Sequence, residues 1–239
     1  QPVAAALSDG GTLMSSIGVV SGGAGDIGRG FALRVADCHE IVVLVDIDVA
    51  AAEKAARDLG TAERFVALGC DVTSEVELAA LASKIAGFGL VHTLVNNAGA
   101  ARAVSLHDTD GDIWRKDNAL NLEAPFLCFR AFADALKQSQ GSVVNISSVN
   151  GMAVFGHPAY SAAKAGLIHL TKLIAVEYGK FGIRANAVAP GTVRTQAWEA
   201  RAAANPQVFE EAKRWYALRR GLTAGQAELA RTFSQSEHY

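Results

Sequence analysis

Residues 17–30, Ile-Gly-Val-Val-Ser-Gly-Gly-Ala-Gly-Asp-Ile-Gly-Arg-Gly, decide how this chain folds. The first four residues are apolar and mostly β-branched, and an apolar helical pattern follows at residues 31–35. A strand, a glycine-rich turn and a helix in this order present helix N-terminal amides to a phosphate group. Glycine also marks ordinary turns, so the turn alone is weak evidence for a nucleotide site. The segments that follow the turn decide between a nucleotide site and an ordinary turn.

Further apolar runs alternate along the chain with helical patterns. The expected strands are residues 41–45, 65–70, 90–95, 142–146 and 183–188, and the expected helices are residues 49–59, 75–88, 109–121, 122–136 and 160–178. Such alternation predicts an α/β fold, a doubly wound parallel sheet of the Rossmann type with helices on both faces. We expect a single domain at residues 17–220. Residues 1–16 would be an extension, disordered or foreign to a natural chain that starts near Met14, and residues 221–239 a C-terminal tail.

Polar residues stand where three of these strands end, which is where ligands bind in such sheets. They are Asp46, Asp71 and Asn97. Asp46 lies about twenty residues past the glycine turn, where a carboxylate accepts hydrogen bonds from an adenosine ribose and repels a 2′-phosphate. This favours NAD over NADP. Asp46 could also cap the helix at residues 49–59, and its spacing supports both roles; Thr73 or Ser74 could cap the helix that begins at Glu75.

The segment at residues 145–164, Asn-Ile-Ser-Ser-Val-Asn-Gly-Met-Ala-Val-Phe-Gly-His-Pro-Ala-Tyr-Ser-Ala-Ala-Lys, is the candidate for chemistry. Tyr160 and Lys164 are four residues apart, so on a helix they share one face. A neighbouring cation favours the phenolate and would lower the pKa of Tyr160. Taken alone, the pair is more often an amphipathic tyrosine and a solvated lysine.

The composition narrows the possible partners. Hydrophobic residues make up 50% of the 239, charged residues 19%, and the net charge is −2. No run reaches the roughly 18 apolar residues of a membrane span, and the basic residues are too scattered for a nucleic-acid surface. Cys38, Cys70 and Cys128 are odd in number and far apart, which indicates free thiols in a cytoplasmic protein and no bound metal. The helix at residues 122–136 is apolar nearly all round, so we expect a partner subunit against one side.

Ordered motifs make the chain resemble the short-chain dehydrogenase/reductase family, in its single-domain branch. They are the turn Ser21-Gly22-x-x-x-Asp26-Ile27-Gly28, the segment Asn96-Asn97-Ala98-Gly99, the pair Tyr160 and Lys164, Asn121, Ser148, and Pro190-Gly191 with Thr195. The resemblance runs from about residue 17 to about residue 220. It implies an NAD-dependent enzyme that interconverts a secondary alcohol or polyol and its ketone, and a homo-oligomer, a tetramer, built on the helices at residues 122–136 and 160–178.

The resemblance also assigns roles in the site. Tyr160 would be the general acid and base, Lys164 would lower its pKa and hold the nicotinamide ribose, Ser148 would bind the substrate oxygen, and Asn121 would fix a relay water. Ser147 is the alternative to Ser148. Cofactor contacts are expected from Gly22, Gly25, Asp26, Ile27, Gly28, Asp46, Ile47, Asp71, Val72, Asn97, Ala98, Gly99, Tyr160, Lys164, Pro190, Gly191, Val193 and Thr195. Substrate contacts are expected from Ser148, Asn150, His157, Tyr160 and Trp198, although His157 could simply bond within its loop.

Two departures from the family pattern keep alternatives open. Asp26 replaces the usual middle glycine of the turn and could cap the helix there. Between Arg220 and Gly221 the sequence lacks the helix and final strand that the family usually has, through either a real deletion or an incomplete sequence; a real deletion would leave a sheet edge uncovered. The alternatives are an NADPH-dependent 3-oxoacyl thioester reductase, disfavoured by Asp46, and a nucleotide-binding relative without catalysis, disfavoured by the joint presence of the four catalytic candidates.

Overall fold

The computed structural model describes residues 14–195, 203, 207, 222 and 223, and these contain one six-stranded sheet. All of its strand pairs are parallel, in the order β3-β2-β1-β4-β5-β6. The strands are β1 (Ser16–Ser21), β2 (Ile41–Asp46), β3 (Phe65–Gly69), β4 (Leu90–Asn96), β5 (Ser142–Ile146) and β6 (Arg184–Val188). The order reverses between β1 and β4, so the carboxyl ends of these two strands form the crevice where ligands bind in doubly wound sheets.

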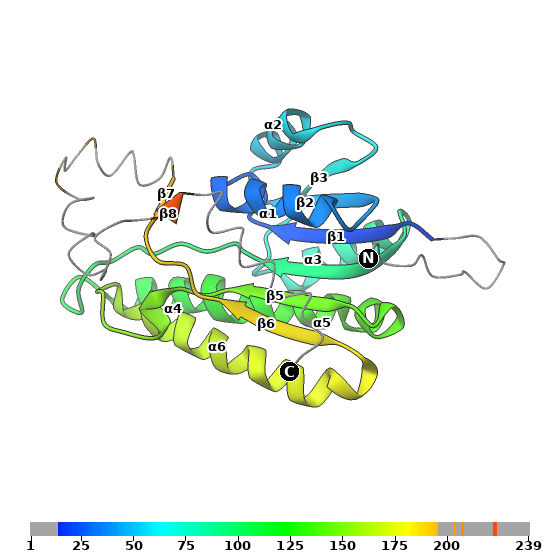
Figure 1. The fold of residues 1–239 in the computed structure, drawn as a ribbon. Coiled ribbons are helices and arrows are strands. Elements are labelled where there is room, and N and C mark those ends of the chain that lie inside the picture. The colour runs from blue at the N-terminus through cyan, green and yellow to red at the C-terminus, as the bar shows by residue number, and fades with distance from the viewer. Residues whose placement is uncertain (1–13, 196–202, 204–206, 208–221, 224–239) are drawn as a thin grey trace.

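Helices cover both faces of the sheet, as the sequence predicts (Figure 1). They are α1 (Asp26–Ala36), α2 (Val49–Leu59), α3 (Glu75–Ala86), α4 (Gly111–Asn118), α5 (Ala124–Ser139) and α6 (Pro158–Tyr178). One apolar core joins α1 and α2 to the sheet through Phe31 and Ala55. The other joins α3, α5 and α6 to it through Leu78, Phe132 and Ile174. Burial on both faces explains why the strands read as continuous apolar runs.

The helical region before β5 differs from the sequence prediction. Instead of two adjoining α-helices at residues 109–121 and 122–136, a π-helical turn, η1 (Ala119–Glu123), separates α4 from α5. In η1 the amide of Ala124 donates to the carbonyl of Ala119, five residues earlier. Pro125 has no N–H, so the ordinary α-helical bond to the carbonyl of Asn121 cannot form. Asn121 therefore lies at an irregular turn, a feature that is frequent at functional sites.

The expectation of a helix apolar all round is only partly met. In α5, Leu127, Phe129, Phe132 and Leu136 are buried in the core, whereas Phe126 is 40% exposed. One side of α5 therefore packs within this chain. Whether a partner covers the other side stays a prediction.

The remaining sequence expectations concern metals, membranes and the chain ends. All three cysteines are free thiols. Among the described residues, no group of His, Cys, Asp or Glu side chains could hold a metal ion. Within the same residues, no helix is long and apolar enough to cross a membrane. The two-residue strand β8 (Leu222–Thr223) pairs with β7 (Val193–Arg194), and the junction of Arg220 and Gly221 lies outside the described part, so the domain boundaries stay predictions.

Candidate active site

The glycine-rich turn between β1 and α1 is held closed by a neighbouring strand end. Asn97 donates from Nδ2 to the carbonyls of Ser21 at 3.1 Å and Gly22 at 3.0 Å. Gly22 has a φ of +62°, and a Cβ on Gly28 would lie 2.1 Å from the carbonyl oxygen of Gly22. Glycine is thus required at both positions, by backbone conformation at Gly22 and by close approach at Gly28.

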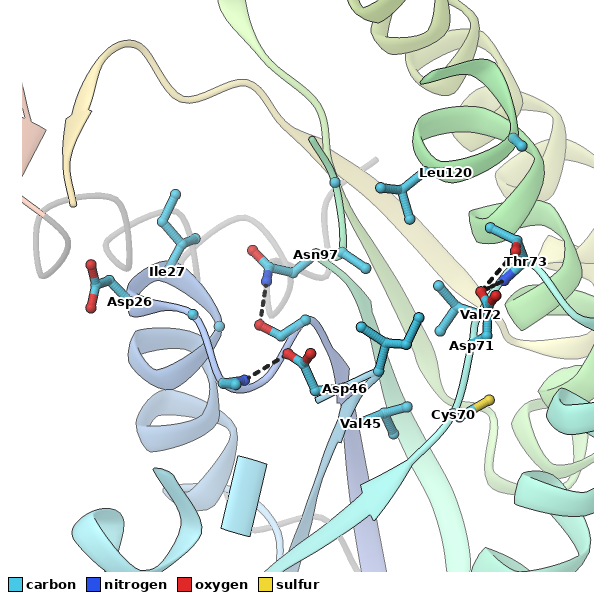
Figure 2. Close-up of a pocket in the computed structure, with 18 of the residues that line it drawn as sticks. Asp26, Ile27, Val45, Asp46, Cys70, Asp71, Val72, Thr73, Asn97 and Leu120 are labelled. Atoms are coloured by element: carbon cyan, nitrogen blue, oxygen red, sulfur yellow. Dashed lines mark hydrogen bonds between the residues drawn. The ribbon is translucent and has the colours of Figure 1, made fainter. Parts of the chain in front are cut away.

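Asp26 does not cap α1, contrary to the suggestion from the sequence. The N-cap position belongs to Gly25, which makes no side-chain cap bond, and Asp26 is the first residue of the helix. A carboxylate in the first turn still interacts favourably with the helix dipole. It also lies on the wall of the adjacent cavity, as Figure 2 shows.

Asp46 does not cap α2 either, because Asp48 does so by accepting from the amide of Ala51 at 3.0 Å. The Oδ1 of Asp46 accepts from Asp48 N at 3.2 Å. Its Oδ2 accepts from Ala24 N at 3.1 Å, a bond that Figure 2 shows. These two bonds fix the carboxylate beside the glycine turn. Each oxygen keeps a lone pair for a further donor.

A cavity of about 770 Å³ opens at the carboxyl ends of β1, β2 and β4. We call it the larger cavity. Of the residues predicted to contact a cofactor, it is lined by Gly22, Gly25, Asp26, Ile27, Gly28, Asp46, Ile47, Asp71, Val72, Asn97, Ala98, Gly99 and Thr195. Asp71 Oδ1 accepts from the amide and hydroxyl of Thr73, and Ser74 caps α3.

Several residues of this wall were not predicted from the sequence: Ala24, Thr73, Arg102, Lys116, Ala119 and Leu120. Thr73 and Leu120 adjoin residues that the motifs did identify, so their neighbourhood was a usable signal. Arg102 and Lys116 belong to no motif. Only the folding of the segment after β4 back over α4 brings these two cations to the wall.

A second cavity of about 280 Å³, the smaller cavity, adjoins the first. The two share Ile27, Asn97, Gly99 and Thr195 on their walls. The smaller cavity also contains the predicted residues Ser148, Asn150, His157, Tyr160, Lys164, Pro190, Gly191 and Val193. A ligand that extends through both cavities would thus pass from the glycine turn to Tyr160.

Lys164 is buried and Tyr160 is half-buried, and this burial controls the acidity of both side chains. Lys164 is 3% exposed; burial lowers its pKa to about 8, and its Nζ donates to the carbonyl of Ile146 at 2.7 Å. Burial raises the pKa of Tyr160, and a hydrogen bond from Ser148 partly offsets the rise. The Lys164 Nζ lies 5.5 Å from the centre of the Tyr160 ring. The sequence-based expectation of a lowered Tyr160 pKa is therefore wrong, because loss of hydration is the largest effect on this group.

The structure distinguishes the two adjacent serines. Ser147 Oγ donates to the carbonyl of Lys164 at 2.8 Å, which uses the hydroxyl to hold α6 against β5. Ser148 Oγ bonds with Asn150 and with the Tyr160 side chain. Of the two, Ser148 is the serine whose hydroxyl faces the tyrosine.

Asn121 is fully buried beside Lys164 without lining either cavity. Its Nδ2 donates to the carbonyls of Ala100 at 2.7 Å and Asp117 at 2.8 Å, whereas its Oδ1 has no hydrogen-bond partner among the described residues. A Cβ placed on Gly99 would lie 2.7 Å from this Oδ1 and 3.3 Å from Lys164 Nζ. Both groups therefore surround one point at Gly99. A buried acceptor without a partner suits an ordered water.

His157 bonds within its own loop region. Its amide donates to the Val104 carbonyl at 2.9 Å, and its Nδ1 contacts the Ala103 carbonyl oxygen at 2.8 Å. It also adopts a left-handed φ of 53°. These contacts match the structural interpretation of His157, although its ring reaches the smaller cavity. Trp198, the remaining substrate candidate, lies outside the described residues.

The chain belongs to the short-chain dehydrogenase/reductase family. The short chain dehydrogenase family model matches residues 16–206. Over 188 residues the chain is 38% identical to trans-4-hydroxycyclohexanecarboxylate dehydrogenase of Sinomonas cyclohexanicum, covering 75% of this chain and 73% of that protein. Over 155 residues it is 41% identical to inactive 2-(S)-hydroxypropyl-CoM dehydrogenase 2 of Xanthobacter autotrophicus, covering 64% of this chain and 66% of that protein.

A solved structure agrees with this assignment. The crystal structure of an oxidoreductase of the same family from Burkholderia thailandensis has a TM-score of 0.85 and 38% sequence identity, and the match covers 95% of this chain and 87% of that one. The protein is accordingly an oxidoreductase of this family, whose fold binds a nicotinamide dinucleotide. The residues present fit such a group, since the glycine turn leaves no room for side chains at Gly22 and Gly28, where a pyrophosphate must approach the backbone.

Proposed function

We propose that this protein is an NAD(H)-dependent oxidoreductase that interconverts a secondary alcohol or polyol and the corresponding ketone. The observation that carries the proposal is the junction of the two cavities, where Ser148, Tyr160 and Lys164 meet the wall that continues to Asp46. When bound, the nicotinamide cofactor supplies the hydride donor or acceptor. The protein's own residues handle the proton and the orientation of the substrate.

Tyr160 is the proposed proton carrier. In reduction its phenol gives a proton to the substrate oxygen, and in oxidation its phenolate removes the proton of the alcohol. Ser148, which bonds to Tyr160, would donate a hydrogen bond to the same substrate oxygen. Lys164 would hold the nicotinamide ribose. Asn121, beside Lys164, would hold a water that carries protons onward.

The preference for NAD rests on Asp46. Its carboxylate is fixed by the amides of Ala24 and Asp48 on the wall of the larger cavity. A 2′-phosphate next to it would place like charges together, which costs several kcal/mol in an unscreened site. This argues against the alternative, a 3-oxoacyl thioester reductase that uses NADPH.

The described wall of the smaller cavity carries one charged side chain, that of Lys164, and so has no cluster of cations that would bind a phosphorylated substrate. We therefore propose a secondary alcohol as the substrate class. The relative from Sinomonas acts, by its name, on trans-4-hydroxycyclohexanecarboxylate, which contains a secondary alcohol. The inactive relative from Xanthobacter motivates a second candidate, a nucleotide-binding protein without catalysis. The convergence of Ser148, Tyr160, Lys164 and Asn121 favours the enzyme, since binding alone requires no proton path.

We also propose a homo-oligomer, a tetramer, formed through α5 and α6. Apolar side chains remain exposed on these helices, with Phe126 at 40%, Leu173 at 44% and Val176 at 81%. Sedimentation at micromolar concentration should give a species larger than the 25.0 kDa chain, and a monomer would contradict this. A reducing compartment such as the cytoplasm stays a prediction from the sequence.

The test of function is a panel of secondary alcohols and polyols offered with NAD or NADP, followed by absorbance of the reduced cofactor. We expect turnover with NAD, and a kcat/KM at least about tenfold lower with NADP, because of the charge of Asp46. A preference for NADP would refute the cofactor assignment. Binding of NADH without turnover of any alcohol, or of any ketone in the reverse direction, would favour the non-catalytic candidate.

A further inference from the structure

Asp117 of α4 fastens the segment that follows β4, although it lines neither cavity. Its side chain is 1% exposed, and its Oδ2 accepts from the backbone amide of Arg102 at 3.3 Å. Its Oδ1 forms a salt bridge with the guanidinium of Arg102, which is 37% exposed and lies on the wall of the larger cavity. A buried carboxylate is costly unless it is paired and hydrogen-bonded, and Arg102 supplies both kinds of partner.

The same backbone segment holds Asn121 in place. The Nδ2 of Asn121 bonds to the carbonyl of Asp117 and to the carbonyl of Ala100, two residues before Arg102. The end of α4 and the segment after β4 are thus joined twice, by Asp117 with Arg102 and by Asn121 with Ala100. Because Asn121 belongs to the π-helical turn η1, regular helix geometry does not by itself fix its position.

The position of Asn121 matters because its Oδ1 and the Lys164 Nζ surround the same point at Gly99. Asn121 is bonded both to Ala100 and to Asp117, so a movement of residues 99–102 relative to α4 would break one of these bonds and let its Oδ1 shift relative to Lys164. Misplacement of a functional group by about 1 Å can lower a rate about a hundredfold.

We propose that Asp117, through its ion pair with Arg102, is a positioning residue for the proton path. It holds residues 99–102 and Asn121 so that the Asn121 Oδ1 faces Lys164. The inference rests on the proposed function for its kinetic consequence. The competing explanation is a buried ion pair that only stabilises the fold, and it predicts no specific effect on kcat.

The test compares Asp117→Asn and Arg102→Gln with the conservative Arg102→Lys and with Asp112→Asn. The last variant is a matched control, because Asp112 pairs with Arg115 on the same helix with side chains 73% and 72% exposed. For Asp117→Asn we expect kcat to fall about tenfold to a hundredfold while KM for NAD changes less than about threefold. Arg102→Lys should lose less kcat than Arg102→Gln because the ammonium keeps the charge, and Asp112→Asn should match the wild type within about twofold.

Hydrogen–deuterium exchange of the cofactor-free proteins supplies a readout that does not need turnover. Exchange in residues 99–104 and 117–123 should be faster in Asp117→Asn than in the wild type and unchanged in Asp112→Asn. If kcat stays within about twofold of the wild type in both Asp117→Asn and Arg102→Gln, or falls only with the thermal stability, the proposal is wrong. Should Asp117→Asn fail to fold, the two Arg102 variants decide by the same criteria.

The outcomes separate the two proposals. A wild type that turns over no alcohol or ketone with either cofactor would refute the proposed function. The exchange data would still test whether the ion pair of Asp117 with Arg102 holds residues 99–102 and Asn121 in place. If the wild type is active and Asp117→Asn shows unchanged exchange and unchanged kcat, only the positioning role of Asp117 is refuted.

Discussion

The two cavities share Asn97 and Gly99 on their walls, yet different kinds of chemical group line the rest of each cavity. The larger cavity is made of backbone at a glycine turn together with carboxylates at strand ends, and most of its residues come from short local motifs. The smaller cavity brings together Ser148, Tyr160 and Lys164, and burial alters the pKa values of Tyr160 and Lys164. Binding of a dinucleotide needs close approach to a rigid backbone, whereas proton transfer needs groups whose acidity the interior has changed.

Replacing Tyr160 should abolish proton transfer in the smaller cavity and leave cofactor binding in the larger cavity nearly unchanged. For Tyr160→Phe we expect kcat to fall about a thousandfold, because the proton carrier is removed. The dissociation constant of NADH should change less than about threefold, since the ring and its packing remain. Steady-state kinetics and a fluorescence titration of NADH measure the two effects. Intact turnover in the variant would overturn the assignment of Tyr160.

Adding one methyl group to the glycine turn should instead weaken cofactor binding in the larger cavity. In Gly28→Ala the new Cβ would lie 2.1 Å from the Gly22 carbonyl oxygen, which is backbone and cannot yield cheaply. Overpacking of this kind costs about 1–3 kcal/mol, so the affinity for NADH should fall about tenfold to a hundredfold.

Gly25→Ala is the comparison for this change, because its Cβ would meet the same oxygen at an ordinary 3.6 Å. It should cost clearly less affinity than Gly28→Ala. Equal losses in the two variants would show that steric closure of the turn is not what Gly28 provides.

Removing one charge should change the choice of cofactor within the larger cavity. In Asp46→Asn the side chain keeps an acceptor near the amides of Ala24 and Asp48 but loses the charge that repels a 2′-phosphate. We expect the kcat/KM ratio of NAD to NADP to fall about tenfold. A ratio that does not move in the variant would mean that the discrimination arises elsewhere.

The smallest expected effect is a shift of a pH profile. The Ser148 hydrogen bond lowers the pKa of Tyr160 against the effect of burial, so Ser148→Ala should raise the apparent pKa for alcohol oxidation. Oxidation requires the phenolate. The rate deficit caused by this shift should therefore be present below the wild-type pKa and should shrink as the pH rises above both values.

The profile of kcat for oxidation, followed from pH 6 to the highest pH at which both proteins stay folded, measures the shift, with Ser147→Ala as the comparison. The Ser147 hydroxyl donates to the Lys164 carbonyl rather than to Tyr160. A shift of the same size in both variants would argue against a specific bond between Ser148 and Tyr160.

Much of the fold was predictable because its signals are local. The strand runs, the positions of Asp46, Asp71 and Asn97 after them, and the glycines of the turn each depend on a few adjacent residues. The π-helical turn at Asn121 was not predicted, although Pro125 offered a clue through its missing N–H. The capping role suggested for Asp46 was wrong because Asp48, two residues further on, has the geometry to accept from Ala51.

The sequence by itself determined the sheet, the glycine-rich turn and the identities of the catalytic candidates, since periodicity, glycine sterics and residue chemistry act over short stretches. Only the tertiary structure decided the acidity of Tyr160 and Lys164, the lack of a partner for the Asn121 Oδ1 within the described part of the chain, and the ion pair of Asp117 with Arg102. Those properties depend on burial and on contacts between segments distant in the chain. Desolvation and long-range pairing leave no mark in a local pattern of residues.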